Sequence, residues 1–292
     1  MSRLRALALV GVLVLPVSSA LAQNRECSLD SWAEDLVAAW NRRGMVPNAP
    51  CYAGAITSMD TARRMRDRVV ERFDRMFPRA GYKVVGLDPV NAKLPGVDRP
   101  MVGVMYVSMF VPNGSTIPLS SAERLITEPD LLISIKDAGI NDATTLEEAL
   151  SHLDRVYAFI EVPAPTFNNS PPNPYMMQAS NLLPRWGVIG EGVAVSPNAA
   201  FLRSLETMRV TFRDGNGKVL ANQPGSYLGK NPLNAVLVVL EELKRRGERL
   251  HPGDLISAGS YMPPIPVTPD MYTETVYEGI GGTTLRVSAR YR

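Results

Sequence analysis

Two short apolar runs with acidic residues at their ends constrain how this chain can fold. Residues 131–135 and 156–160 match buried strands of a sheet. Glu128 and Asp130 stand two residues apart at the start of the first run, and side chains two apart in a strand project from the same face. Glu161 ends the second run. A neighbouring strand would therefore bring a third carboxylate to the first two.

Three carboxylates around one point suit a hard divalent cation. Mg²⁺ and Mn²⁺ prefer oxygen ligands, whereas zinc sites favour His and Cys. Glu128, Asp130 and Glu161 are therefore candidate ligands for Mg²⁺ or Mn²⁺. The alternative is that they are ordinary exposed acids at strand ends, because acidic pairs at this spacing are common.

The first 22 residues have the composition of a secretory signal peptide. Two early arginines precede an apolar stretch over residues 6–17, and the segment ends in Ala-Leu-Ala. The apolar stretch is short for a membrane span, so we expect cleavage after Ala22. No later segment is apolar enough to cross a membrane. We therefore predict a periplasmic or secreted protein.

The two cysteines, Cys27 and Cys51, fit an exported protein. In an oxidising compartment, a disulfide that closes this loop would stabilise the fold by about 3 kcal/mol. A pair of free thiols is the alternative. A catalytic cysteine is disfavoured because only His152 and His251 exist to activate it, and neither lies in a recognisable motif.

Composition indicates a globular protein of enzyme size. The net charge of +2, with no basic run, gives no support for nucleic-acid binding. The 24 prolines and 22 glycines indicate many turns and short strands, as in mixed α/β or β-rich folds. Residues 163–175 form a proline-rich stretch that we expect to be a long loop, a candidate lid over a pocket.

Periodicity predicts both helices and strands along the chain. The expected helices cover residues 29–42, 59–76, 145–153 and 232–246. The expected strands cover residues 83–88, 101–110, 130–136, 204–212 and 283–291, with a further strand after the turn at residues 251–253. Residues 214–217 are expected to turn a hairpin.

Five blocks carry a resemblance to a known family. They are GYKVVGLDP, EPDLLISIKDAGIND, FIEVP, KNPLNAVLVVLEELKRRGERLHPGDLISAGSY and YEGIGGTTLRVSAR. In the same order, they resemble blocks of the 2-hydroxypentadienoate hydratase and 4-oxalocrotonate decarboxylase family, within the fumarylacetoacetate hydrolase superfamily. The resemblance extends from about residue 59 to the end of the chain.

The resemblance implies an α+β fold, a mixed β-roll or β-sandwich of the fumarylacetoacetate hydrolase C-terminal type with flanking helices. The mature chain would then comprise an N-terminal helical segment, residues 23–80, and a catalytic domain, residues 81–292. It also implies Mg²⁺ or Mn²⁺ held by three acids and a small-molecule 2-oxo acid substrate. A homo-oligomer is a further possibility that the sequence does not decide.

The resemblance assigns roles to individual residues. The family's paired acids usually follow Glu-x-Glu; here Asp130 is one methylene shorter at the second position, and Glu161 matches the third acid. Lys83 falls where the hydratases carry an active-site lysine, with an ordinary solvated lysine as the alternative. Ser260 resembles a position that faces the substrate.

We therefore predict a metal-dependent lyase of hydratase type. It would act on a 2-oxo acid or 2-hydroxydienoate through an enolate that the metal stabilises. A carbon–carbon bond hydrolase or a decarboxylase of the same superfamily is one alternative. The hydrolases use a histidine, and neither His152 nor His251 lies in a block resembling that position. The other alternative is an exported, non-catalytic protein that binds 2-oxo acids or other small molecules.

Overall fold

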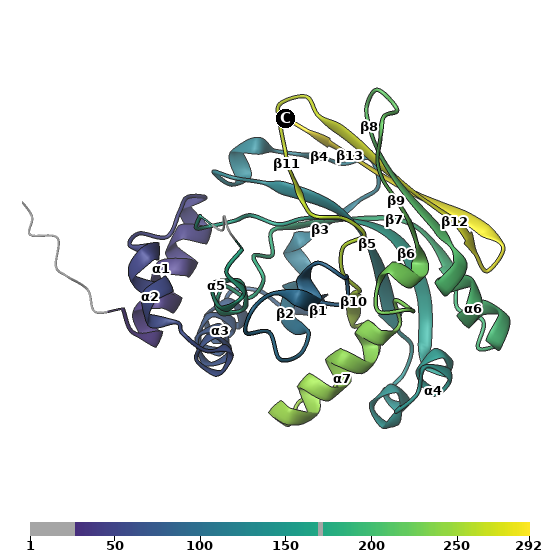
Figure 1. Cartoon of the computed structure of the whole chain (residues 1–292), viewed down its shortest axis with the longest axis horizontal. Helices are drawn as coiled ribbons and strands as arrows, with labels where there is room; N and C mark the ends of the chain where they lie inside the picture. Colours follow the sequence, from purple (N-terminus) through teal and green to yellow (C-terminus); the bar gives the residue numbers. More distant parts are fainter. Residues whose placement is uncertain (1–26, 169–171) are drawn as a thin grey trace, which may run out of the picture.

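The computed structural model describes residues 27–168 and 172–292 of the chain. The expected signal peptide, residues 1–22, lies outside the described residues. Within them, the fold combines two β-sheets with helices on the flanks (Figure 1). The expectation of an α+β fold is therefore confirmed.

The larger sheet contains the predicted acidic strand pair. Its strands in spatial order are β2 (Met101–Tyr106), β1 (Arg79–Val85), β10 (Leu255–Ser257), β5 (Ile126–Ile135), β6 (Leu153–Val162), β7 (Trp186–Ala194) and β3 (Phe110–Pro112), with β11 (Ile265–Pro266) paired to β5. β1 runs parallel to β10, and β5 is antiparallel to both β10 and β6. Strands far apart in the sequence thus become neighbours at the centre of this sheet.

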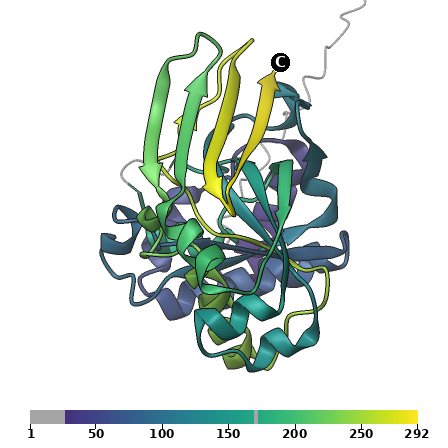
Figure 2. The same ribbon diagram turned by 90° about the vertical axis from the view of Figure 1, so that its right-hand side faces the viewer.

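The smaller sheet is built mainly from the C-terminal third of the chain. Its spatial order is β4 (Thr116–Ile117), β13 (Thr283–Tyr291), β12 (Tyr272–Ile280), β8 (Arg209–Asp214) and β9 (Val219–Pro224). β13 packs against β6 and β7, which joins the two sheets (Figure 2).

Helices gather at two places around the sheets (Figure 1). One group comprises α1 (Leu29–Arg42), α2 (Ala49–Ala55), α3 (Met59–Asp74) and α5 (Pro174–Ala179). The others are α4 (Leu146–Ser151), α6 (Ala199–Thr207) and α7 (Asn234–Arg246). Local signals explain several boundaries: Thr145 and Glu148 form a capping box at α4, and α7 ends at Gly247 with a φ of 68°.

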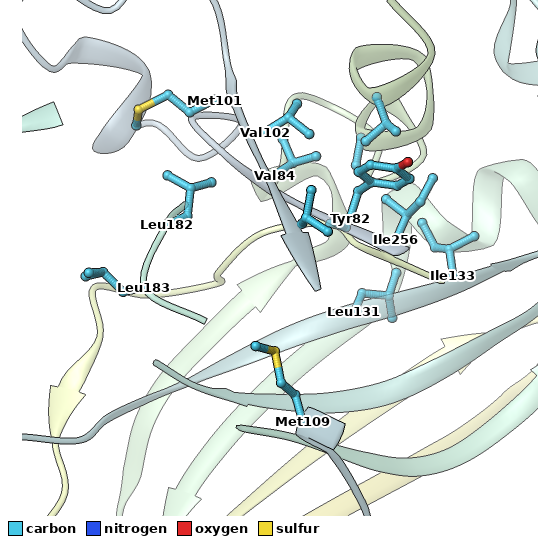
Figure 3. Close-up of a cluster of buried hydrophobic side chains, with 14 of the residues drawn as sticks. Tyr82, Val84, Met101, Val102, Met109, Leu131, Ile133, Leu182, Leu183 and Ile256 are labelled. Carbon is cyan, nitrogen blue, oxygen red and sulfur yellow. The ribbon is translucent and has the colours of Figure 1, made fainter. Parts of the chain in front are cut away.

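Successive side chains of a strand point to opposite sides of the sheet, so the larger sheet has an apolar face and a second face that carries polar groups. Tyr82, Ile256 and Ile133 lie in register across β1, β10 and β5, and their side chains lie together in the apolar core (Figure 3). The next residues in the same three strands point to the opposite face. They are Lys83, Ser257 and Leu132.

Two predicted strands were partly wrong. The strand predicted over residues 101–110 is interrupted by a 3-10 helix over Val107–Met109, and the strand predicted over residues 204–212 was wrong in its first half. Residues 204–207 belong to the end of α6, and β8 begins only at Arg209. Asn198 explains the helix, because its side chain accepts a hydrogen bond from the Phe201 N–H and caps the first turn. Phe201 and Leu205 are both buried, as expected for one helical face.

Candidate active site

The β5–β6 pairing brings the predicted acids to one face of the sheet. Glu128 and Glu161 are directly opposite in register, and Asp130 is opposite Phe159. Lys83 reaches the same face through the pairing of β1 with β10 and of β10 with β5. The candidate residues therefore come from strands whose neighbourhood is fixed by backbone hydrogen bonds.

Lys83 is buried and ion-paired rather than solvated. Its side chain is 2% exposed, and its Nζ donates hydrogen bonds to Glu161 Oε1 and, at 3.1 Å, to the carbonyl oxygen of Leu182. Burying an ammonium group costs free energy unless the group is ion-paired and hydrogen-bonded. Lys83 has an ion-pair partner in Glu161 and a hydrogen-bond acceptor in the Leu182 carbonyl.

The three acids are buried as well, so they are not exposed strand-end residues. Burial, together with the negative charge of Glu161, raises the pKa of Glu128 well above its usual value, although the Lys83 charge opposes this. Burial and Glu161 also raise the pKa of Asp130 to about 7. Because each carboxylate disfavours ionisation of its neighbour, the cluster would be stabilised by additional positive charge.

The donor set fits a hard divalent ion, but the side chains are engaged with protein groups. Asp130 accepts hydrogen bonds from the Ser257 hydroxyl and, at 3.0 Å, from the Gly259 N–H. Over residues 27–168 and 172–292, no three His, Cys, Asp or Glu side chains are arranged to hold a metal. An ion at Glu128, Asp130 and Glu161 would therefore compete with Lys83 and Ser257 for carboxylate oxygens.

A cavity of about 130 Å³ opens onto Lys83, Glu128 and Glu161. Ser260 also lines it, and its hydroxyl donates to the Met262 carbonyl at 2.5 Å. The structure thus brings together four predicted site residues, with Asp130 packed beside the cavity against β10. We call this space the inner cavity.

Residues 181–183 form a wall that the sequence did not predict. Asn181, Leu182 and Leu183 have φ angles of 57°, 58° and 60°. A left-handed backbone costs a non-glycine residue about 1–2 kcal/mol, so three in a row need strong support from elsewhere. The Asn181 side chain supplies it by accepting from the Val104 N–H at 2.7 Å and donating to the Val104 carbonyl at 2.9 Å. The tolerance of Asn for this conformation was the one local signal.

Comparisons with known proteins give distant sequence relatives and structural neighbours. No protein-family model matches the chain. The chain is 23% identical to 4-oxalocrotonate decarboxylase of Pseudomonas putida, over 70% of this chain and 78% of the relative. It is 27% identical to 2-keto-4-pentenoate hydratase of Paraburkholderia xenovorans (strain LB400), over 78% and 80%.

Solved structures decide the fold. The 4-oxalocrotonate decarboxylase of Pseudomonas putida G7, complexed with calcium and acetate, matches with a TM-score of 0.74 at 20% identity, over 90% of this chain and 97% of that one. Fumarylpyruvate hydrolase from Pseudomonas aeruginosa, in complex with Mn²⁺ and pyruvate, gives a TM-score of 0.51 at 17% identity, over 74% and 90%. The chain has the fold of the fumarylacetoacetate hydrolase superfamily. Its resemblance to the hydratase and decarboxylase family is confirmed by the two sequence relatives.

Neither histidine of this chain lies at the candidate active site. His152 Nδ1 lies 2.6 Å from Asp137 Oδ1. The side chain of His251 is 78% exposed. Both residues lie outside the walls of the inner cavity.

Helix α1 is hydrogen-bonded to the segment that forms one wall of the inner cavity. Trp32 Nε1 donates to the Ala179 carbonyl at 2.8 Å, and Trp40 Nε1 donates to the Pro184 carbonyl at 3.1 Å. Both acceptors flank the left-handed segment, so α1 is attached to the cavity wall. Cys27 and Cys51 are bonded to each other in the structure, which ties the start of α1 to α2. Among the described helices, none is long and apolar enough to cross a bilayer.

Proposed function

We propose that this chain is a divalent-metal-dependent lyase of hydratase type that acts on a 2-oxo acid or a 2-hydroxydienoate. The observation that carries the proposal is the buried ammonium of Lys83, which lies among carboxylates at a cavity. The likeness to 2-keto-4-pentenoate hydratases supports it. The likeness to a decarboxylase supports the same substrate class.

Glu128, Asp130 and Glu161 are the residues that would hold the ion. Their oxygens are the ligands that Mg²⁺ and Mn²⁺ prefer, and the raised pKa values of Glu128 and Asp130 reflect an excess of negative charge that a cation would offset. When bound, the ion supplies Lewis acidity to the 2-oxo group and its neighbouring carboxylate.

The chain's own groups contribute to proton movement. Hydration of a dienoate requires one group to deliver a proton to carbon and another to accept a proton from water. Lys83 Nζ is the candidate proton donor at the cavity, whereas the carboxylates of Glu128 and Glu161 would be engaged with the ion. The Ser260 hydroxyl, which lines the cavity, would orient the substrate. Burial of Lys83 excludes bulk water from the donor.

Hydrolysis of a carbon–carbon bond is the weaker alternative. The superfamily hydrolases that the sequence resembles use a histidine, and in this chain His152 is hydrogen-bonded to Asp137 instead. Decarboxylation breaks the bond to a carboxylate and releases carbon dioxide, whereas hydration adds water to a double bond, so measuring released carbon dioxide distinguishes the two reactions.

Metal analysis of the purified protein, combined with an ultraviolet absorbance screen of 2-oxo acids and 2-hydroxydienoates, tests the proposal. We expect bound Mg²⁺ or Mn²⁺, together with loss of dienoate absorbance that stops in the presence of a chelator. Metal-dependent binding of 2-oxo acids without turnover on any dienoate would instead indicate a binding protein.

A further inference from the structure

An apolar groove continues outward from the inner cavity. The groove has a volume of about 730 Å³, and its walls include Leu119, Ala122, Leu125, Phe167, Pro263 and Val267. It shares the side chains of Ile126, Met177, Leu183 and Pro264 with the inner cavity. The two spaces therefore lie side by side and share a wall, with a polar inner end and an apolar outer part, which we call the outer groove.

The inner cavity alone is small for a ligand. Its volume of about 130 Å³ is below the ~300–1,000 Å³ that is typical of small-molecule sites, so it fits little more than a compact head group. The charged groups Lys83, Glu128 and Glu161 lie only at this end. A ligand that fills both parts must therefore have a charged head and an apolar tail.

We propose that the substrate is a 2-oxo acid, or its enol, with an unbranched or aromatic apolar tail that lies in the outer groove. The part of this inference that concerns the head group rests on the proposed function. The part that concerns the tail rests on the outer groove alone.

The charges around the outer groove do not favour a second carboxylate. Glu123 and Arg124 are its charged wall residues in the described part of the chain, and both are exposed. They have opposite charges. Neither is a buried cation that could bind a carboxylate at the far end of a ligand. A tail that ends in a carboxylate would therefore gain little, whereas a tail of methylenes would be removed from water by the apolar walls.

Val267 is the position from which to test the tail. It is half-buried in the groove wall, and its backbone N–H donates to the Leu125 carbonyl at 3.0 Å, which a side-chain change leaves in place. Val219, an exposed valine of β9 outside the groove, offers a matched control.

The experiment is calorimetric titration of the full mature protein with Mn²⁺ present. The probes are pyruvate, 2-oxohexanoate, 2-oxooctanoate, 2-oxoadipate and octanoate. From the free energy of burying a methylene, affinity should rise roughly tenfold from 2-oxohexanoate to 2-oxooctanoate. Val267→Asp should remove that gain and leave pyruvate binding unchanged, while Val219→Asp should alter neither. Ala122→Leu, which adds apolar bulk without charge, should also weaken binding of 2-oxooctanoate more than that of pyruvate.

Several results would overturn the inference. One is equal affinity for short and long 2-oxo acids. Another is that neither 2-oxooctanoate nor octanoate binds. The third is that 2-oxoadipate binds more tightly than 2-oxohexanoate and that Arg124→Ala abolishes this preference. A change in molecular mass in Val267→Asp would show that a second copy of the chain covers the groove instead.

The two proposals can fail separately. If pyruvate binds with Mn²⁺ but longer tails add nothing, the inference about the tail is wrong and the proposed function stands. If octanoate binds as tightly as 2-oxooctanoate, and neither depends on Mn²⁺, the tail site stands and the proposed function is contradicted.

Discussion

The carbonyl oxygen of Leu182 accepts a hydrogen bond from Lys83 Nζ at 3.1 Å, so a buried lysine of β1 is held by a residue with left-handed backbone. Leu182 lies between two other residues of the same conformation, Asn181 and Leu183. The position of the candidate proton donor thus depends on a segment that is costly to form and that is held by backbone hydrogen bonds to α5 and by the Asn181 side chain on β2.

Asn181→Ala should destabilise the protein. The change removes two hydrogen bonds to the Val104 backbone and leaves those buried groups without a partner, so the free energy of unfolding should fall by about 2–4 kcal/mol. Urea denaturation measures this. Asn216→Ala, in the exposed β8–β9 turn, is the control and should have little effect. A fall no larger than that of the control would mean that the segment is held by other contacts.

Glu128→Ala and Glu161→Gln should each weaken binding of Mn²⁺ at least tenfold, since loss of even an outer-shell group costs about 10–100-fold in metal affinity. Glutamine is chosen at position 161 because it keeps a hydrogen-bond acceptor for Lys83. Calorimetric titration is the measurement, with Glu147→Ala on the exposed side of α4 as control. Unchanged affinity in both variants would place any metal elsewhere.

The metal-free protein should be less stable at pH 8 than at pH 5. The folded-state pKa of Asp130 is raised to about 7, above its unfolded value, and that of Glu128 is also raised. An acid with a raised pKa resists ionisation only in the folded state, so stability is lost as pH rises through the folded pKa. Thermal unfolding in a chelator should show a lower Tm at pH 8.

Two controls accompany that measurement. Asp130→Asn should reduce the pH dependence, because the amide does not titrate, and added Mn²⁺ should restore the Tm at pH 8 by compensating the charge. A Tm that rises from pH 5 to pH 8 without metal would contradict the assignment of buried, mutually repelling acids.

Protein recovered from the periplasm should contain the Cys27–Cys51 disulfide. The Cα atoms lie 6.2 Å apart, within the range that a disulfide spans, and export would provide an oxidising compartment. Mass spectrometry should find each chain two hydrogens lighter than the reduced form. Two titratable thiols per chain would contradict both the disulfide and the expected export.

Local patterns predicted the strands of the site better than they predicted its walls. The pairing of Glu128 with Glu161 followed from apolar runs whose period of two is local. Lys83 could be assigned only through the family resemblance, because nothing around it distinguishes a buried lysine from a solvated one. The left-handed segment at Leu182 was not predicted, because Asn181 was its one local signal and the hydrogen bonds of that side chain reach Val104, far away in the sequence. The strand predicted from Ser204 was wrong at its start for a local reason, because the Asn198 side chain caps a helix that includes Ser204.

Turnover by Lys83→Met tests the central claim most directly. Methionine keeps the approximate length of the side chain but cannot donate a proton, so kcat for hydration of 2-hydroxypentadienoate should fall by about 10² or more in protein that the circular dichroism spectrum shows to be folded. Lys218→Met, at an exposed turn, is the control and should keep full activity. Full activity in Lys83→Met, measured by loss of dienoate absorbance under the same conditions, would contradict the role assigned to the buried lysine.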